Sequence, residues 1–392
     1  MFRRRDGDLQ AAINADGGRL NRAGTGSVQV TQETALRHSG VWAARRLRAN
    51  LVGALPVDAY RLIGGVQVEV PKGPLLTEPG GSDWLIGEWL WASQWDLDGY
   101  GNFFGVITQR DGLGLPRQVE PVSAAEVTVL GKGPDITGYR VGGNRRTTYD
   151  PYDIWHERQY RVSGLPVGLC PVAYAAWSIG GHLSAVAFAN DYFARGGNPS
   201  GVLRNTMARI PDAAAGAELK AAFKAATYGG DIFVTGKDWE WMPASAPEAA
   251  TAFLDQQRSG IVDVARFFDV PADTIDGAVS GSSITYANVS QRNLQLLIMS
   301  LGPTVKRRED RLSRALPAPR FVKLNTDALL RMDPEARARV INGKVQARVL
   351  APSEARALDD RQPFTEDQMS EFDRLYGAPR TIPVTATGVP TT

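Results

Sequence analysis

Cysteine and histidine are scarce in this chain of 392 residues, which has one cysteine and three histidines. A single cysteine, Cys170, excludes an internal disulfide and any metal site built from several cysteines. Nothing in the sequence therefore ties folding to an oxidising compartment. The histidines, His38, His156 and His182, are far apart in sequence and form no H-E-x-x-H or i,i+4 pair. They do not predict a zinc site.

A strong net charge is also absent. The chain has 44 Lys and Arg against 42 Asp and Glu, which leaves a formal net charge of +2. This balance does not indicate a general nucleic-acid binder. Hydrophobic residues make up 43% and charged residues 22%, which is typical of a folded protein able to bury a full core. The start, MFRRRDGD, is basic but lacks the apolar stretch of a secretory signal.

One long uncharged run needs a membrane test. Residues Val172 to Asn190 contain no Asp, Glu, Lys or Arg, and 19 residues reach the length of a membrane-spanning helix. The run is mostly Ala, Gly and Ser, with His182 inside it. It lacks the Leu, Ile and Phe density that favours insertion. We expect a close-packed helix in a protein assembly and no membrane insertion.

Catalytic motifs are missing as well. The nearest approach to a phosphate-binding loop, Gly230 to Asp238, has five residues between its glycines and Asp where a hydroxyl must meet magnesium. Ser280 stands in G-x-x-S-G spacing, which is not a nucleophile elbow. Asp273 and Asp276 make no two-metal site without partners. We predict no enzyme activity, no cofactor and no metal. A weak hydrolase or nuclease would need Asp273 or Asp276.

The first half of the chain is predicted to form an α+β domain. Thr31 is a plausible N-cap for a helix running to about Val52, with an apolar stripe of Leu36, Trp42, Leu47 and Leu51. A hairpin over 56–70 turns at Gly64-Gly65, and Ser82 is the expected cap of a helix over 84–97. Short strands are expected at 103–110, 118–121, 127–130, 139–141 and 154–157.

The second half is predicted to be mainly helical. Pro171 opens a helix to about Arg195, and a small α/β insert with strands at 202–203, 232–235 and 239–242 follows. A second helix covers 247–268, a loop follows Val270-Pro271, and a third helix covers 284–316 with a bend at Gly302-Pro303. A strand at 321–324 and short helices at 334–344 and 353–358 complete the chain.

The stretch from Ile261 to Leu316 resembles phage portal proteins of the HK97-like family. The matching residues are Val264, Ala265, Phe267, Phe268, Val270, Pro271, Gly277, Ser282, Ser283, Thr285 to Asn288, Gln291, Leu301, Pro303 and Glu309. Three further stretches are similar in the same order: Glu33 to Tyr60, Asn190 to Leu203, and Arg331 to Glu335 with Ala351 to Arg356. The sequence departs from the family pattern at Ile275-Asp276, Arg308 and Ser353.

The resemblance implies an α+β, portal-like fold with a wing, two long stem helices bracketing a small α/β clip, a tunnel loop, a long wing helix and a short helical crown. The implied segments are a flexible N-terminal arm (1–27), wing (28–168), stem helix 1 (169–195), clip (196–246), stem helix 2 (247–269), tunnel loop (270–283), long wing helix and return strand (284–330), crown-like helices (331–376) and a flexible tail (377–392).

The same resemblance implies a non-enzymatic ring of twelve subunits at one capsid vertex of a tailed phage, prophage or gene transfer agent. Double-stranded DNA would pass through the ring without sequence specificity, during packaging and ejection. Implied partners are the terminase large subunit, a head–tail adaptor and the major capsid protein, with assembly in the bacterial host cytoplasm. The alternative is a non-viral α+β scaffold or DNA-binding assembly protein without a channel.

Candidate site residues follow from these segments. The candidate DNA-facing residues of the tunnel loop are Asp273, Asp276, Gly277, Ser280, Gly281, Ser282 and Ser283; the loop could equally be a plain surface connector. Channel-facing candidates in stem helix 2 are Glu248, Asp255 and Arg258, although an ordinary amphipathic helix has the same pattern. Clip candidates for terminase or adaptor contact are Arg204, Arg209, Lys220, Lys224 and Lys237.

A basic run lies in the long wing helix, formed by Lys306, Arg307, Arg308, Arg311 and Arg314. By itself such a run indicates a nucleic-acid patch. The run is compatible with salt bridges to neighbouring subunits and also with contact to packaged DNA.

Overall fold

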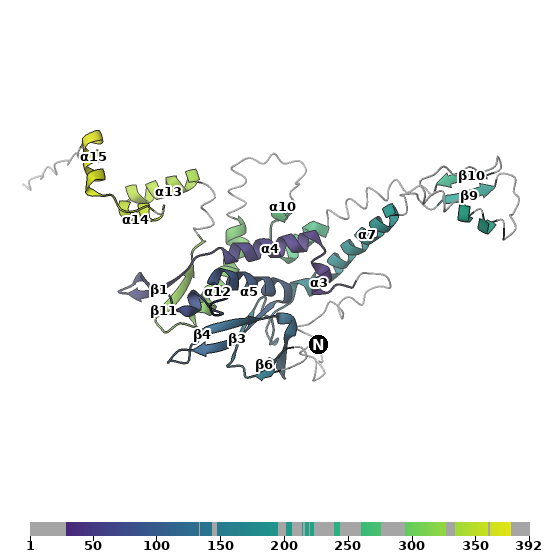
Figure 1. Cartoon of the computed structure of the whole chain (residues 1–392), viewed down its shortest axis with the longest axis horizontal. Coiled ribbons are helices and arrows are strands. Elements are labelled where there is room, and N and C mark those ends of the chain that lie inside the picture. The colour runs from purple at the N-terminus through teal and green to yellow at the C-terminus, as the bar shows by residue number, and fades with distance from the viewer. Residues whose placement is uncertain are drawn as a thin grey trace, which may run out of the picture. The chain divides into compact units, whose positions relative to one another are not determined.

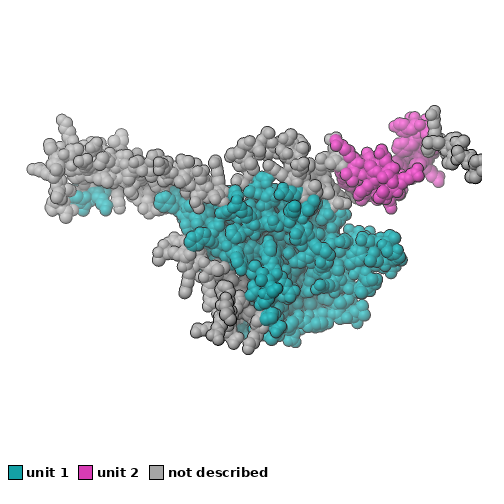
Figure 2. All heavy atoms as spheres, turned by 180° about the vertical axis from the view of Figure 1, so that it is seen from behind, with its two compact units in different colours: residues 1–326 teal, residues 327–392 magenta. Residues whose placement is uncertain are grey.

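The computed structural model describes residues 29–132, 134–142, 147–194, 201–205, 239–243, 260–275, 295–326, 334–359 and 361–377, with scattered positions between 214 and 222. The chain divides into two compact units, residues 1–326 and 327–392, which are described separately (Figures 1 and 2). The described residues combine helices with small antiparallel sheets, so the predicted α+β class is confirmed.

The first predicted helix is two helices, α3 (Gln32–Ala35) and α4 (Ser39–Gly53). Thr31 caps α3 as predicted, but His38 starts a second helix because its Nδ1 accepts a hydrogen bond from the Gly40 amide at 3.1 Å. The predicted apolar stripe is wrong at Trp42, which is 45% exposed. The buried face of α4 contains Val41, Ala44, Arg45, Arg48, Ala49 and Val52.

The predicted hairpin is confirmed as β1 (Val57–Ile63) and β2 (Val66–Val70). Gly64 and Gly65 have φ values of 59° and 84°, which glycine adopts at little steric cost. The predicted return strand is β11 (Arg320–Leu324), which pairs antiparallel with β1. The sheet order is β11-β1-β2, so segments about 260 residues apart in sequence lie side by side.

Helix α5 (Ile86–Tyr100) begins later than predicted, since its N-cap is Leu85 and not Ser82. The Glu88 carboxylate accepts a hydrogen bond from the Leu85 amide at 3.3 Å and fixes this start. Gly101, with φ of 73°, ends the helix. Helices α4 and α5 lie side by side, and the Gly53 and Gly87 backbones approach closely at one end of the pair.

Two three-stranded sheets follow α5. The first has the order β4-β3-β8, formed by β3 (Asn102–Arg110), β4 (Pro116–Val122) and β8 (Ile154–Arg158); the second has the order β5-β6-β7, formed by β5 (Val127–Lys132), β6 (Asp135–Val141) and β7 (Thr147–Tyr149). All five predicted strands are present, and β7 was not predicted. Short 3-10 turns, η1 (Pro74–Leu76) and η2 (Ala124–Glu126), join elements. Phe104, Val129 and Tyr139 pack between the sheets.

The predicted helix from Pro171 is α6 (Pro171–Tyr174) followed by α7 (Ala176–Ala194), with a break at Ala175. No helix in the described part of the chain is both long and apolar enough to cross a membrane. Strands β9 (Gly201–Asn205) and β10 (Trp239–Pro243) pair antiparallel, at two of the three strand positions predicted for the insert. The predicted strand at 232–235 lies outside the described residues.

Residues Gly260–Phe267 are helical, and α10 (Ala272–Ile275) follows the predicted break at Val270-Pro271. The third long helix is described from Gln295. It has a π-helical turn, η3 (Leu296–Leu301), and then becomes α12 (Gly302–Ser313), so its geometry changes where a bend was predicted. The second unit contains α13 (Pro334–Gln346), α14 (Pro352–Ala357) and α15 (Glu366–Tyr376). Helix α15 lies within the segment 331–376 predicted to hold crown-like helices, although its own bounds were not predicted; Thr365 and Gln368 form a capping box at its start.

Candidate functional site

The residues on both sides of segment 276–294 are described, although the segment itself is not. On the N-terminal side, Asp269 turns the chain with φ of 53°, just before α10. On the C-terminal side, η3 carries Ser300. The Ser300 hydroxyl donates a hydrogen bond to the backbone carbonyl of Asp269. The two flanks of the segment are therefore joined directly.

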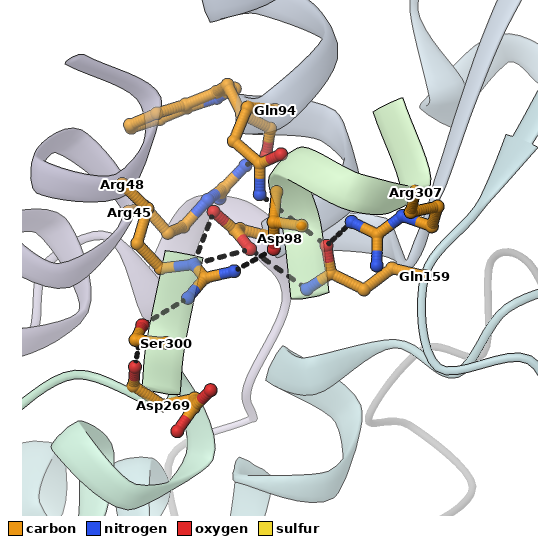
Figure 3. A network of polar contacts seen from close by, with 10 residues as sticks. Arg45, Arg48, Gln94, Asp98, Gln159, Asp269, Ser300 and Arg307 are labelled. Carbon is orange, nitrogen blue, oxygen red and sulfur yellow. Dashed lines mark hydrogen bonds and ion pairs between the residues drawn. The ribbon is translucent and has the colours of Figure 1, made fainter. Parts of the chain in front are cut away.

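Arg48 of α4 ties this junction to the domain core (Figure 3). Its Nη1 donates to Ser300 Oγ at 2.9 Å, and its Nη2 donates to Thr304 Oγ1 at 3.1 Å. Its Nε lies 3.1 Å from both carboxylate oxygens of Asp98 on α5. We call Arg48, Asp98, Asp269, Ser300 and Thr304 the loop platform.

Electrostatics keep the platform charged although it is buried. The Arg48 and Asp98 side chains are 2% and 1% exposed. Burial lowers the pKa of Arg48, but Asp98, Tyr160 and Asp269 together outweigh it and the pKa is raised. Arg48 therefore remains a cation in the folded state. Breaking such a buried pair by removing one partner costs about 3–5 kcal/mol, because the other charge stays buried and uncompensated.

The network continues from Asp98 into α12. Gln159 Nε2 donates to Asp98 Oδ1 at 2.9 Å, and Gln159 Oε1 accepts from Arg307 Nη2 at 3.2 Å. Figure 3 shows Gln159 between Asp98 and Arg307. Elements α4, α5, η3 and α12 thus share one chain of hydrogen bonds, which fixes their relative positions.

A buried apolar cluster supports the same junction. Val264, Phe268, Val270 and Leu296 are buried in one cluster with Ala173, Ala175, Ala176 and Ile179 of the α6–α7 region, and Ile275 packs against it. The helix ending at Phe268 thus packs against the α6–α7 region through Val264 and Phe268. Contacts within the chain account for the small residues at 173, 175 and 176.

A second contact joins α4 to α7. The His38 and His182 rings lie 4.0 Å apart between centroids. A Cβ added at Gly260 would lie 2.8 Å from His182 Nδ1, so the helix from Gly260 passes close to this pair. Burial, followed by the charge of His182, lowers the pKa of His38 to about 4. The pair is therefore neutral near pH 7.

The basic run does not form one exposed patch. Arg308 is fully buried, and its Nη1 lies 2.8 Å from Glu157 Oε2. The proposal of Arg308 as a surface contact is thus corrected, because its side chain is buried and pairs with Glu157 inside the first unit. This burial also explains why an arginine can stand where the family pattern is apolar. The sequence places Glu157 about 150 residues away, so the run alone could not reveal the pair.

The remaining basic candidates differ from one another. Lys306 is exposed and pairs with Asp310 at 2.5 Å. Arg307 is largely buried against Gln159, and the Arg311 guanidinium lies 4.3 Å from the Trp155 ring centroid. Arg314 is exposed. Lys306 and Arg314 are thus the two of this set with open surface.

Most other candidate residues fall outside the described part. Asp273 lies in α10, and the remaining tunnel-loop candidates, Asp276, Gly277, Ser280, Gly281, Ser282 and Ser283, are not described. The stem candidates Glu248, Asp255 and Arg258 are also outside it, as are Arg209, Lys224 and Lys237 of the clip. Arg204 lies on β9, and Lys220 is exposed in a helical stretch. These assignments stay predictions.

No catalytic grouping is apparent among the residues the structure describes. Within them, no set of three or more His, Cys, Asp and Glu could hold a metal ion. Cys170 caps α6, and its Sγ donates to the Gly99 carbonyl at 3.0 Å. Burial raises the pKa of this thiol, which makes it a poor nucleophile.

The platform residues Arg48, Asp98, Ser300 and Thr304 were not predicted from the sequence. One signal was available for Arg48: it shares the buried face of α4 with Val41, Ala44 and Val52. A charged residue within an apolar helical stripe indicates a buried partner. The identity of that partner, Asp98, required the fold.

Comparisons with known proteins agree with this architecture. The family model described as "Phage portal protein" matches residues 39–360. The "Probable portal protein" of Streptomyces phage phiC31 is 26% identical over 378 residues, covering 86% of this chain and 77% of that protein. The "Portal protein" of Enterobacteria phage HK97 is 23% identical over 377 residues, covering 93% and 87%.

Solved structures share the fold. An HK97 family phage portal protein from Corynebacterium diphtheriae superposes with a TM-score of 0.59 at 19% identity, covering 78% of this chain and 100% of that one. A chain from the neck of a native gene transfer agent particle, computed with C12 symmetry, gives 0.56 at 19% identity, covering 90% and 99%. The matched family model spans well over half of the sequence, and the chain belongs to the phage portal protein family, in its HK97-like branch.

Proposed function

We propose that twelve copies of this chain form a ring at one vertex of a capsid, through which double-stranded DNA is packaged and later ejected. Family membership supports the ring, and a structurally similar chain comes from a particle neck computed with C12 symmetry. The observation that supports the proposal most directly is the loop platform, in which Ser300 and Asp269 join the chain on either side of the predicted tunnel loop, 270–283, on a buried base. A loop projecting toward moving DNA needs such a base.

The near-neutral net charge of the chain favours passage of DNA over tight binding of DNA. Affinity for a phosphate backbone rises with every phosphate that a protein neutralises, and one basic side chain per subunit becomes a collar of charge in a ring. A conduit should therefore be close to neutral, and the net charge of +2 fits. None of the tunnel-loop candidates Asp273, Asp276, Ser280, Ser282 and Ser283 is a basic residue.

The chain is a structural component and not the motor. The translocating energy is assigned to a terminase docked on the clip, and a head–tail adaptor takes the same end after packaging. Lys220 is an exposed clip candidate for such contacts. The major capsid protein surrounds the wing, and assembly takes place in the bacterial host cytoplasm before the ring becomes part of the virion.

A non-viral scaffold without a channel is the weaker candidate, because the family match covers the wing and the loop flanks together. Light scattering on the purified chain separates the two. A ring of twelve copies of 42.4 kDa has a mass of roughly 510 kDa, independent of concentration over a wide range. A monomer or dimer at high concentration would contradict self-assembly of the ring.

A further inference from the structure

Three tryptophans form an unusual outer face on the α4–α5 pair. Trp91 and Trp95 stack with centroids 5.3 Å apart, and Trp42 meets Trp95 edge-on at 5.5 Å. Trp42 is 45% exposed, and the other two are half-buried. Exposed aromatic groups of this kind are typical of protein–protein contacts, where tryptophan carries much of the binding energy.

A pocket opens beside this face, at the C-terminal end of α4 and the N-terminal end of α5. Its volume is about 580 Å³, and its lining includes Asn50, Asp83, Trp84, Glu88 and Trp91. Trp91 Nε1 donates to Asn50 Oδ1 at 2.7 Å, which fixes the indole in place. We call this site the acidic tryptophan pocket.

The chemistry of the pocket selects a cation. Asp83 and Glu88 are both exposed at it. No salt bridge is formed by either carboxylate within the described residues, and Glu88 accepts only the Leu85 amide there. Indole faces attract guanidinium groups, and carboxylates pair with them bidentately. An arginine side chain from a partner satisfies both features.

Uncompensated arginines lie near the opposite end of α5. Arg158 is opposite Asn102 in the β3–β8 ladder, two residues beyond the end of α5. Arg161 is exposed and bridges Gly168, where an added Cβ would lie 2.1 Å from the Gly101 carbonyl oxygen. Neither arginine forms an ion pair within the described chain. Burial and the nearby charges of Arg161 and Arg311 lower the pKa of Arg158, which places the Arg158 and Arg161 side chains close enough to repel each other.

The two surfaces stand at opposite ends of one rigid helix. Helix α5 has 15 residues, which gives a separation of about 22 Å along its axis. They are different in kind and complementary in charge. A closed ring with more than two subunits requires such a head-to-tail contact, in which one surface meets a different surface of the next copy.

We propose that, in the ring, the acidic tryptophan pocket of one subunit receives Arg158 and Arg161 of its neighbour. The partner is thus a second copy of this chain. The inference rests on the proposed ring and adds the residues that make its subunit contact. Trp42 and Trp95 extend the contact as an apolar rim around the charged centre.

Two charge-reversed variants test this contact by complementation. The pocket variant carries Asp83→Arg and Glu88→Arg, and the arginine variant carries Arg158→Glu and Arg161→Glu. Each variant alone places like charges at every contact, so each should assemble at least about 100-fold more weakly than the parent chain. An equimolar mixture places opposite charges at every contact, in alternating order. Rings with an even number of subunits should return, as judged by light scattering and class averages.

A matched control reverses two exposed carboxylates elsewhere, Glu120→Arg with Glu126→Arg, and should assemble like the parent chain. Two single variants, Asp83→Arg in one chain and Arg161→Glu in the other, repeat the mixing test without changing the half-buried Arg158. Circular dichroism confirms that each variant is folded. Variants that assemble alone like the parent, or folded variants whose mixture stays dissociated, would overturn the contact and leave the ring proposal intact.

A parent chain that forms no ring would count against self-assembly, and the contact would then be judged by sedimentation of the mixture. Selective binding of one variant to the other, without self-binding, supports the contact. Equal binding in all combinations, or none in any combination, refutes it.

Discussion

Arg48 and Asp98 form a buried ion pair, with the Arg48 Nε 3.1 Å from each oxygen of the Asp98 carboxylate. The pair joins α4 to α5, and the other two nitrogens of Arg48 reach Ser300 and Thr304. One side chain therefore links α4 and α5 to both flanks of segment 276–294 through Ser300. The consequences of removing it are specific.

Replacing Arg48 by Met should lower the free energy of unfolding of the first unit by about 3–5 kcal/mol, because Asp98 is left buried without its partner. Urea denaturation followed by tryptophan fluorescence measures the loss. The matched control is Arg46→Met on the same helix, where the side chain is exposed and the change should be within about 0.5 kcal/mol. Equal effects at the two positions would contradict the role given to the pair.

Ser300→Ala should loosen the joined flanks while leaving the fold intact. The substitution removes the bond to the Asp269 carbonyl and leaves an Arg48 nitrogen without its acceptor, a cost of about 1–3 kcal/mol. Hydrogen exchange should speed up at Val270–Ile275 and Leu296–Leu301 and remain unchanged in β3. Ser123→Ala, on an exposed turn, is the control. Unchanged exchange at both flanks would refute the platform.

Gly101→Ala should destabilise the chain far more than Gly64→Ala. Both glycines have positive φ, 73° and 59°, and alanine there costs about 1–2 kcal/mol. A Cβ at Gly64 meets nothing within 4 Å, whereas at Gly101 it would lie 2.0 Å from the Leu169 carbonyl oxygen. The difference in unfolding temperature between the two variants measures the cost of the clash between the added Cβ and the Leu169 carbonyl oxygen. Similar losses would mean that the α5 end can relax.

Acid should destabilise the contact between α4 and α7 through His38. Its pKa is about 4 in the fold, against 6.5 as its ordinary value, so the unfolded chain binds a proton first as the pH falls. Stability is complete above pH 6.5 and decreases by about 3 kcal/mol as the pH falls through 4.

His38→Asn keeps an N-cap acceptor for α4 and removes this proton. Its free energy of unfolding should decrease less between pH 6.5 and 4 than that of the parent chain. His156, also buried with a lowered pKa, contributes equally in both proteins and cancels in the difference. Identical pH profiles for the variant and the parent would remove His38 as the cause.

Local patterns predicted local structure well. The Gly64-Gly65 turn, the strands with alternating apolar residues and the stop at Val270-Pro271 all follow from backbone preferences that neighbouring residues decide. Helix starts were predicted less accurately, because the observed N-caps His38 and Leu85 are not the residue types that most often cap helices. The break at Ala175 has no local signal in the sequence.

Long-range polar pairs could not be predicted. Arg308 looked like part of a surface run, and only its contact with Glu157 shows that it is interior. Arg48 and Asp98 lie 50 residues apart, and Arg48 and Thr304 lie 256 apart. Periodicity reports which face of a helix is buried, but it carries no information on which distant charge compensates a buried one.

Electron cryomicroscopy of the purified assembly, reconstructed without imposed symmetry, tests the central claim most directly. The account predicts a closed ring, twelve-fold in symmetry, with an axial channel wide enough for double-stranded DNA and with the predicted tunnel loop, 270–283, of each subunit facing the axis. A closed particle without an axial opening, or a ring with this segment on its outer rim, would contradict the conduit.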